Sequence, residues 1–173
     1  MALIIEDGTG VANANSYVDL TEARSFAESR GLTLPEDDTE AETELVKGFD
    51  YINTFRTLYG GSKASCTQSG QFPRSGLYID GCEVPATSIP FETKQAQVYA
   101  ASLTTTGEEL YVNSSGKEVA SERVEGAVSV SYFENGNPNA QPYFAAIEKL
   151  LDPMFKYNQP GSGSVGILLG IRV

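Results

Sequence analysis

The stretch that decides the fold reads Gln-Phe-Pro-Arg-Ser-Gly at residues 71–76, Tyr-Ile-Asp-Gly-Cys-Glu-Val at residues 78–84, and Ile-Pro at residues 89–90. Pro73 favours an extended conformation for Phe72, the residue before it. Asp80-Gly81 between two short apolar runs is a strong signal for a tight β-hairpin. Pro90 fits the first position of a helix. The stretch predicts a turn, a hairpin and a helix start, with key positions at Phe72, Pro73, Arg74, Gly76, Asp80, Gly81 and Pro90.

Two helices are expected before this stretch. Asp-Leu-Thr-Glu at residues 19–22 is a capping box with Asp19 as N-cap, and it predicts a helix over residues 20–30 that stops at Gly31. Thr-Glu-Ala-Glu at residues 39–42 is a second capping box, after which apolar residues recur at helical spacing until Gly60-Gly61. This second stripe consists of Leu45, Phe49, Ile52, Phe55 and Tyr59.

Two more helices and a ribbon are expected after it. The third helix begins at Pro90 and presents Ala96, Tyr99, Ala100 and Leu103 on one face. Apolar residues then alternate with serines at 128–132, and residues 119–124 can pair with them, which predicts a β-ribbon at about 118–133. Such a ribbon is marginal alone, so it should lean on helices or on a neighbouring subunit. The last helix opens at Pro142, and its apolar stripe is expected to pack in the core: Phe144, Ile147, Leu150, Leu151, Met154 and Phe155.

The C-terminal region has a different composition. Residues 159–164 read Gln-Pro-Gly-Ser-Gly-Ser, which is typical of a flexible linker, and nine mostly apolar residues follow. This segment either folds back as an edge strand or binds a partner by strand pairing or by filling a groove, and the second alternative is favoured. Its candidate partner-binding residues are Val165, Ile167, Leu168, Leu169, Ile171, Arg172 and Val173.

The pattern therefore predicts a mainly α protein. We expect a bundle of about four helices with the ribbon at about 118–133, the small hairpin at about 78–84 and an extended C-terminal arm. Residues 1–157 would form the helical domain, and residues 158–173 the linker and arm. At 173 residues, with 40% apolar residues, the chain has the size and composition of one ordinary domain.

The charge balance argues against tight binding of nucleic acid. Twelve Lys and Arg face 23 Asp and Glu, which gives a formal net charge of −11. Affinity for DNA comes largely from basic groups that displace counterions, so wrapping or groove-reading is not expected. The simpler explanation is that this charge keeps the protein soluble. The more specific explanation is that it forms a surface over which DNA slides without binding.

Little in the sequence predicts catalysis. The chain has no histidine, no phosphate-binding loop and no serine- or zinc-hydrolase motif. Acidic pairs such as Asp37/Asp38 and Glu108/Glu109 lie in polar stretches, where solvated surface is the ordinary explanation. Asp7, Asn13 and Asn15 lie in a Gly- and Asn-rich loop that lacks the EF-hand pattern. We predict that the protein is not an enzyme and has no cofactor and no metal site.

Other features of the sequence bear on cysteine pairing and on the cellular location of the protein. Cys66 and Cys82 are sixteen positions apart, which is no zinc spacing; free thiols are favoured and a disulfide stays open. The N-terminus lacks the pattern of a signal peptide, and no apolar run is long enough for a membrane span. We expect a soluble product made in a cytoplasm, without a membrane partner.

Arg74 is the residue that comes nearest to a site for single-stranded DNA, which needs stacking aromatic rings beside a basic groove. It lies close in sequence to Phe72 and Tyr78. The alternative is a guanidinium that binds turn carbonyls or an acidic neighbour, and this structural role is favoured.

Several motifs resemble those of the head–tail connector (adaptor) proteins of tailed bacteriophages. The resemblance covers most of residues 3–157, although many relatives have Trp where this chain has Phe72. Some members of that family bear the label of a DnaT-like single-stranded-DNA-binding protein. The similar segments are residues 5–11, 15–18, 72–76, 80–81, 89–90, 126–132 and 144–154, together with Lys94.

The resemblance implies a structural virion protein. Such proteins form a ring, commonly of twelve copies, between the portal protein and the tail or stopper, and double-stranded DNA passes through without specific binding when the genome is ejected. The chain would then be assembled in the host cytoplasm and reside in the phage neck. Its C-terminal arm would bind the portal, so deletion of residues 160–173 should abolish attachment to portal-bearing heads. DnaT-like binding of single-stranded DNA is the alternative function.

Overall fold

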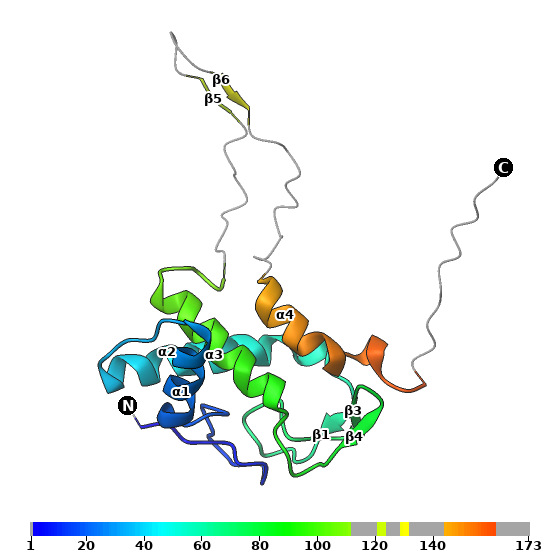
Figure 1. Cartoon of the computed structure of the whole chain (residues 1–173). Helices are drawn as coiled ribbons and strands as arrows, with labels where there is room; N and C mark the ends of the chain where they lie inside the picture. Colours follow the sequence, from blue (N-terminus) through cyan, green and yellow to red (C-terminus); the bar gives the residue numbers. More distant parts are fainter. Residues whose placement is uncertain (1, 112–120, 124–128, 132–143, 162–173) are drawn as a thin grey trace, which may run out of the picture.

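Three α-helices pack around a central fourth in the part of the chain that the computed structural model describes, which is residues 2–111, 121–123, 129–131 and 144–161 (Figure 1). The central helix α3 contacts each of the other three. Short 3₁₀ turns follow α2 and α4. The elements are α1 Leu20–Arg30, α2 Asp38–Thr54, η1 Phe55–Thr57, α3 Phe91–Thr105, α4 Ala145–Leu151, η2 Asp152–Met154 and η3 Lys156–Asn158. The predicted mainly α fold is confirmed.

Small residues let α3 occupy this central position. Ala96 and Ala100 are buried in the larger core cluster, whereas Val98 and Ala101 are buried in a second cluster with Leu45. Gly48 of α2 lies so close to the backbone of α3 that an added Cβ would meet a carbonyl oxygen of that helix. The sequence predicts a single apolar face for this helix, but α3 is buried on two sides because helices pack against both.

The ends of the first two helices test the capping predictions. Asp19 caps α1 by accepting a hydrogen bond from the Glu22 amide at 2.8 Å, and Gly31 ends it in the left-handed conformation, as predicted. The predicted N-cap at Thr39 is wrong. Asp37 caps α2 by accepting from the Glu40 amide at 3.0 Å, so the helix begins at Asp38. The α-helical part of α2 ends at Thr54, before Gly60-Gly61, and the 3₁₀ turn η1 follows it directly.

The starts of the last two helices are also shifted. Pro90 is the N-cap of α3 in an extended conformation, with Phe91 as the first helical residue, so the predicted first position was wrong by one. α4 begins at Ala145, and Pro142, the predicted start, lies outside the described residues. The predicted core stripe is confirmed by burial of Ile147, Leu151, Met154 and Phe155, and Phe144 and Leu150 are partly buried against the same core.

Three antiparallel two-stranded sheets complete the described elements. In the predicted hairpin Ile79 pairs with Cys82, and Asp80 and Gly81 both have positive φ, 51° and 79°, as a tight turn requires. Within the predicted ribbon only the β5 and β6 segments are described, and they pair as expected. The strands are β1 Ser62–Lys63 with β2 Arg74–Ser75, β3 Leu77–Ile79 with β4 Cys82–Val84, and β5 Ser121–Arg123 with β6 Ser129–Ser131.

Both ends of the described body are held by specific contacts. The buried Glu6 carboxylate accepts hydrogen bonds from the backbone amides of Gly8, Gly10 and Val11, so the N-terminal loop folds around it. Near the other end, Gln159 makes paired hydrogen bonds with the backbone of Tyr78 in β3, at 2.7 and 3.1 Å. The structured chain thus extends past residue 157, and the predicted partner-binding arm at residues 165–173 lies outside the described residues.

Candidate functional site

The turn at residues 71–76 is buried at its aromatic residue. Phe72 has no exposed surface, and its ring packs edge-on against Tyr59, with the two ring centroids 4.8 Å apart. The Phe72–Pro73 peptide bond is cis, and Gly76 closes the turn with φ of 67°. This central motif is therefore part of the core, where it joins η1 and β1 to the β3–β4 hairpin.

Arg74 is an internal residue, only 5% exposed. Its guanidinium donates hydrogen bonds to the carbonyl oxygens of Gly60 at 2.6 Å, Gly61 at 3.0 Å and Gln71 at 3.1 Å. It also lies over the Tyr59 ring, 5.8 Å from the centroid. Burial lowers the pKa of Arg74 from its ordinary value. Of the two roles that the sequence allows, the contacts match the one in which Arg74 binds turn carbonyls.

Tyr17 connects the N-terminal loop to the same turn. Its hydroxyl donates to Asn53 Oδ1 at 2.8 Å and accepts from the backbone amides of Gln71 and Phe72. Burial raises the pKa of Tyr17 above its ordinary value. The backbone amide of Tyr17 donates to Gln97 Oε1, which ties this network to α3. No sequence motif marks Tyr17 or Gln97, because their partners are distant in the chain.

Several other cations of the described body are paired with neighbouring acids. Lys94 lies 2.9 Å from both carboxylate oxygens of Glu22, and Lys47 lies 2.7 Å from Glu44. Arg24 contacts Asp38 at 2.7 Å and also donates to backbone carbonyls. These pairs reduce the positive charge that the body can offer to a phosphate backbone.

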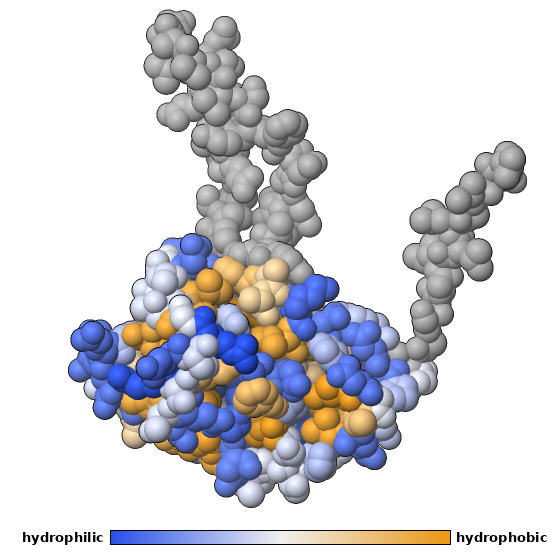
Figure 2. Space-filling model, in the orientation of Figure 1, coloured by the Kyte–Doolittle hydropathy of each residue, from blue (hydrophilic) through white to orange (hydrophobic). Residues whose placement is uncertain are grey.

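A surface groove lies between α1, α3 and α4, and we call it the helical groove. It encloses about 280 Å³, and its lining residues are Phe26, Arg30, Gln95, Tyr99, Ala146, Lys149 and Leu150. On the face that carries these helices, apolar surface lies in separate patches between hydrophilic residues (Figure 2). Three helices far apart in the sequence build this groove, so local sequence patterns do not predict it.

Aromatic rings form one wall of the helical groove. Phe26 packs edge-on against Tyr99 and Phe91, with ring centroids 5.9 and 6.5 Å apart, and Phe91 is 58% exposed. The Arg30 guanidinium covers the Phe26 ring at 5.2 Å from its centroid. With Lys149, the groove offers apolar contact next to two positive charges. It could bind an acidic segment with apolar side chains, or a base with its phosphate.

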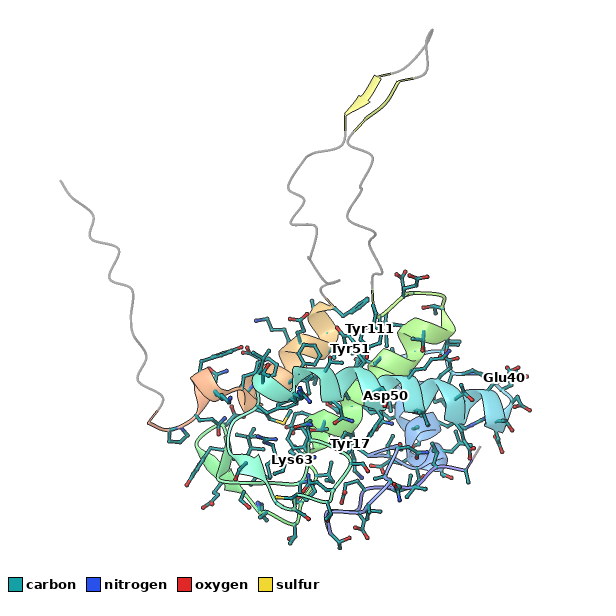
Figure 3. All side chains as sticks on the ribbon, turned by 180° about the vertical axis from the view of Figure 1, so that it is seen from behind. Tyr17, Glu40, Asp50, Tyr51, Lys63 and Tyr111 are labelled. Carbon is teal, nitrogen blue, oxygen red and sulfur yellow. The ribbon has the colours of Figure 1, made fainter. Side chains whose placement is uncertain are left out.

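A third feature is an aromatic cluster formed by the residues on either side of the segment 112–143. Tyr111 precedes residues 112–143 and packs edge-on against Tyr51 of α2, with ring centroids 5.7 Å apart (Figure 3). Phe144, which follows those residues, packs edge-on against the same ring, with centroids 5.9 Å apart. Burial raises the pKa of Tyr51 to about 12, and it also raises the pKa of Asp50 and Tyr111. The two residues that flank the segment 112–143, which contains β5 and β6, therefore meet in one aromatic cluster, which we call the Tyr51 root.

The described residues offer little for metal or covalent chemistry. Among them no group of three or more His, Cys, Asp or Glu side chains could hold a metal ion. Cys66 and Cys82 are both exposed free thiols. No described helix has the length and apolar character of a membrane span.

Comparison with known proteins identifies the family. The sequence model of the family described as "Putative DnaT-like ssDNA binding protein" matches residues 1–169. The chain belongs to this family. No curated protein and no solved structure matches it significantly.

Proposed function

We propose that the chain is a subunit of a head–tail adaptor ring, which joins the portal of a tailed bacteriophage to its tail or stopper. The observation that carries the proposal is the Tyr51 root. Because Tyr111 and Phe144 pack on the same ring, the two residues that flank the segment 112–143 meet at one place on the body. The segment contains the two-stranded β5–β6 ribbon, and such a ribbon suits contacts between subunits better than it suits a reaction.

The charge supports the same function. A net charge of −11 per chain, repeated around a ring, gives the lumen a strong negative potential, over which DNA passes without binding. The internal position of Arg74 and the ion pairs of Lys94, Lys47 and Arg24 are consistent with this. The resemblance of the central motif to head–tail connector proteins supplies the biological setting. The ring, its commonly twelve copies and its place in the virion are parts of the proposal.

Binding of single-stranded DNA is the second candidate function, and the family description favours it. In the described body, the helical groove is the place that best fits it, because aromatic rings and two cations meet there. A sequence-tolerant binder needs successive stacking rings along a basic track. Arg30 already covers the Phe26 ring, which leaves a short site of low positive charge.

Attachment to heads tests the adaptor. Purified chain is mixed with portal-bearing heads that lack it, and cryo-electron microscopy then looks for an added ring at the portal. A variant that ends at Gly161 keeps the Gln159 contacts with β3 but lacks the apolar C-terminal segment. We expect it to fold and to fail in attachment, because that segment is proposed to bind the portal. Full-length chain that never binds such heads would overturn the function.

A fluorescence titration with a labelled oligonucleotide tests the second candidate. Tight binding at low salt that weakens steeply as salt rises would favour it over the adaptor. Lys149→Glu should abolish such binding if the helical groove is the site, whereas Lys156→Glu, at an exposed cation outside the groove, serves as the matched control.

A further inference from the structure

We propose that the helical groove receives the β5–β6 ribbon of a second copy of this chain, so that neighbouring subunits of the ring are linked by an arm in a groove. The inference rests on the proposed ring, and it goes further by naming the two surfaces that meet. The groove is an apolar hollow with a cationic rim, and the ribbon belongs to the segment 112–143, whose flanking residues Tyr111 and Phe144 meet at the Tyr51 root.

Charge complementarity selects the occupant. The groove places Arg30 and Lys149 together on a chain with a net charge of −11. The segment 112–143 is itself acidic, because its charged residues are Glu118, Glu122, Glu125 and Glu134 against Lys117 and Arg123. Opposite charges across an interface guide the partners together and fix their register.

The composition of the ribbon also fits the lining of the groove. The register of β5 and β6 pairs Glu122 with Val130, which places an acidic and an apolar residue at directly opposed positions. The groove offers the same combination, because Lys149 lines it together with Leu150 and Tyr99. An apolar contact flanked by a charge pair is the pattern of a small subunit contact with a polar rim.

The length of the connecting chain permits contact with a neighbouring copy. Lys149 is five helical residues from Phe144, so the groove lies within about 10 Å of the root along α4. β5 begins ten residues beyond Tyr111, a length of chain that spans up to about 33 Å when extended. The paired part of the ribbon can therefore reach well past its own groove, to that of an adjacent subunit.

Site-directed crosslinking between two differently tagged copies tests the contact. Both copies carry Cys66→Ser and Cys82→Ser, which remove the exposed native thiols. One copy has Gln95→Cys in the groove and the other has Val130→Cys in β6. Mild oxidation should give a mixed disulfide between the two tags, whereas Lys47→Cys on α2, outside the groove, should give at least about tenfold less.

Charge reversal tests the energetics in the native background. Sedimentation velocity follows self-association of the wild type and of the double variant Arg30→Glu with Lys149→Glu. We expect about tenfold or greater weakening, because acid would then face acid. Glu122→Lys in the partner copy should restore part of the loss, and Lys156→Glu should leave association unchanged. Circular dichroism checks that each variant folds.

Each outcome decides for or against the contact. A wild type that stays monomeric up to its solubility limit overturns the inference, as does a disulfide that forms only within one chain. Oligonucleotide binding that is lost in the Arg30 and Lys149 variant also overturns it, because the groove would then hold nucleic acid. Attachment of the wild type to portal-bearing heads is scored separately, so the adaptor can stand where the arm-in-groove contact fails.

Discussion

Arg74 and Arg30 have the same side chain, but the two regions around them use it in opposite ways. Arg74 is almost fully buried beside the 71–76 turn, and three backbone carbonyls accept its hydrogen bonds. Arg30 lies on the wall of the helical groove, over the Phe26 ring. The first arginine holds the fold, whereas the second is exposed on the surface. A motif therefore identifies an important residue without saying whether the fold or a partner depends on it.

The largest loss of folding stability is expected when the buried guanidinium of Arg74 is removed. Arg74→Met deletes the hydrogen bonds that the guanidinium donates to the Gly60, Gly61 and Gln71 carbonyls, so these acceptors lose that donor. We expect a loss of about 2–4 kcal/mol in the free energy of unfolding, measured by urea denaturation. A loss below about 1 kcal/mol would contradict the structural role and reopen Arg74 as a surface residue.

High pH should destabilise the tyrosine-rich core in a graded way. Burial raises the pKa of Tyr51 to about 12, above the value of about 10 for an unfolded tyrosine, and it also raises the pKa of Tyr17 and Tyr59. The folded state therefore holds these protons more tightly. The stability that this confers is fully present below about pH 10, and it is lost as the pH rises towards 12.

Chemical denaturation at several alkaline pH values measures this slope. Tyr51→Phe should make the slope shallower without removing it, because Tyr17 and Tyr59 still contribute. Tyr157→Phe is the matched control, since Tyr157 is 60% exposed. A slope that is the same in all three proteins would contradict the assignment to Tyr51.

A smaller loss of folding stability is expected when the Tyr17 hydroxyl, which supports the 71–76 turn, is removed. Tyr17→Phe keeps the ring packed on Phe49 and Phe72 but removes the acceptor for the Gln71 and Phe72 amides. Asn53 Oδ1 still accepts from the Gln71 amide, which limits the loss. We expect about 1–2 kcal/mol by urea denaturation. No change at all would mean that water replaces the hydroxyl, and that the turn is more open than its burial indicates.

Local signals predicted the parts of the fold that local contacts determine. Asp19 and Gly31 at the ends of α1, and Asp80-Gly81 in the hairpin, satisfy backbone groups within a few residues. The α2 cap was misplaced because Asp37, Asp38 and Thr39 are all good caps, and only the folded connector selects Asp37.

Contacts between distant segments could not be predicted in this way. Tyr17 meets Gln97 across 80 positions and Gln159 meets Tyr78 across 81, and no spacing rule links them. The helical groove exists only after three helices have packed. The sequence therefore indicates a candidate site at Arg74, where a motif is visible, and not at Arg30 and Lys149, which are single cations among ordinary helical residues.

The smallest loss of stability is expected for substitutions of the two cations in the helical groove. This result would show most clearly how the groove differs from the buried region around Arg74. Arg30→Ala removes a cation over a ring at a surface site, and such a contact contributes about 0.5–1 kcal/mol. Lys149→Ala removes an exposed cation, for which about 0.5 kcal/mol or less is expected. Both should unfold in urea almost as the wild type does, while self-association weakens. If Arg30→Ala instead cost as much stability as Arg74→Met, Arg30 would have a structural role. That result would contradict the proposal that the helical groove binds a partner.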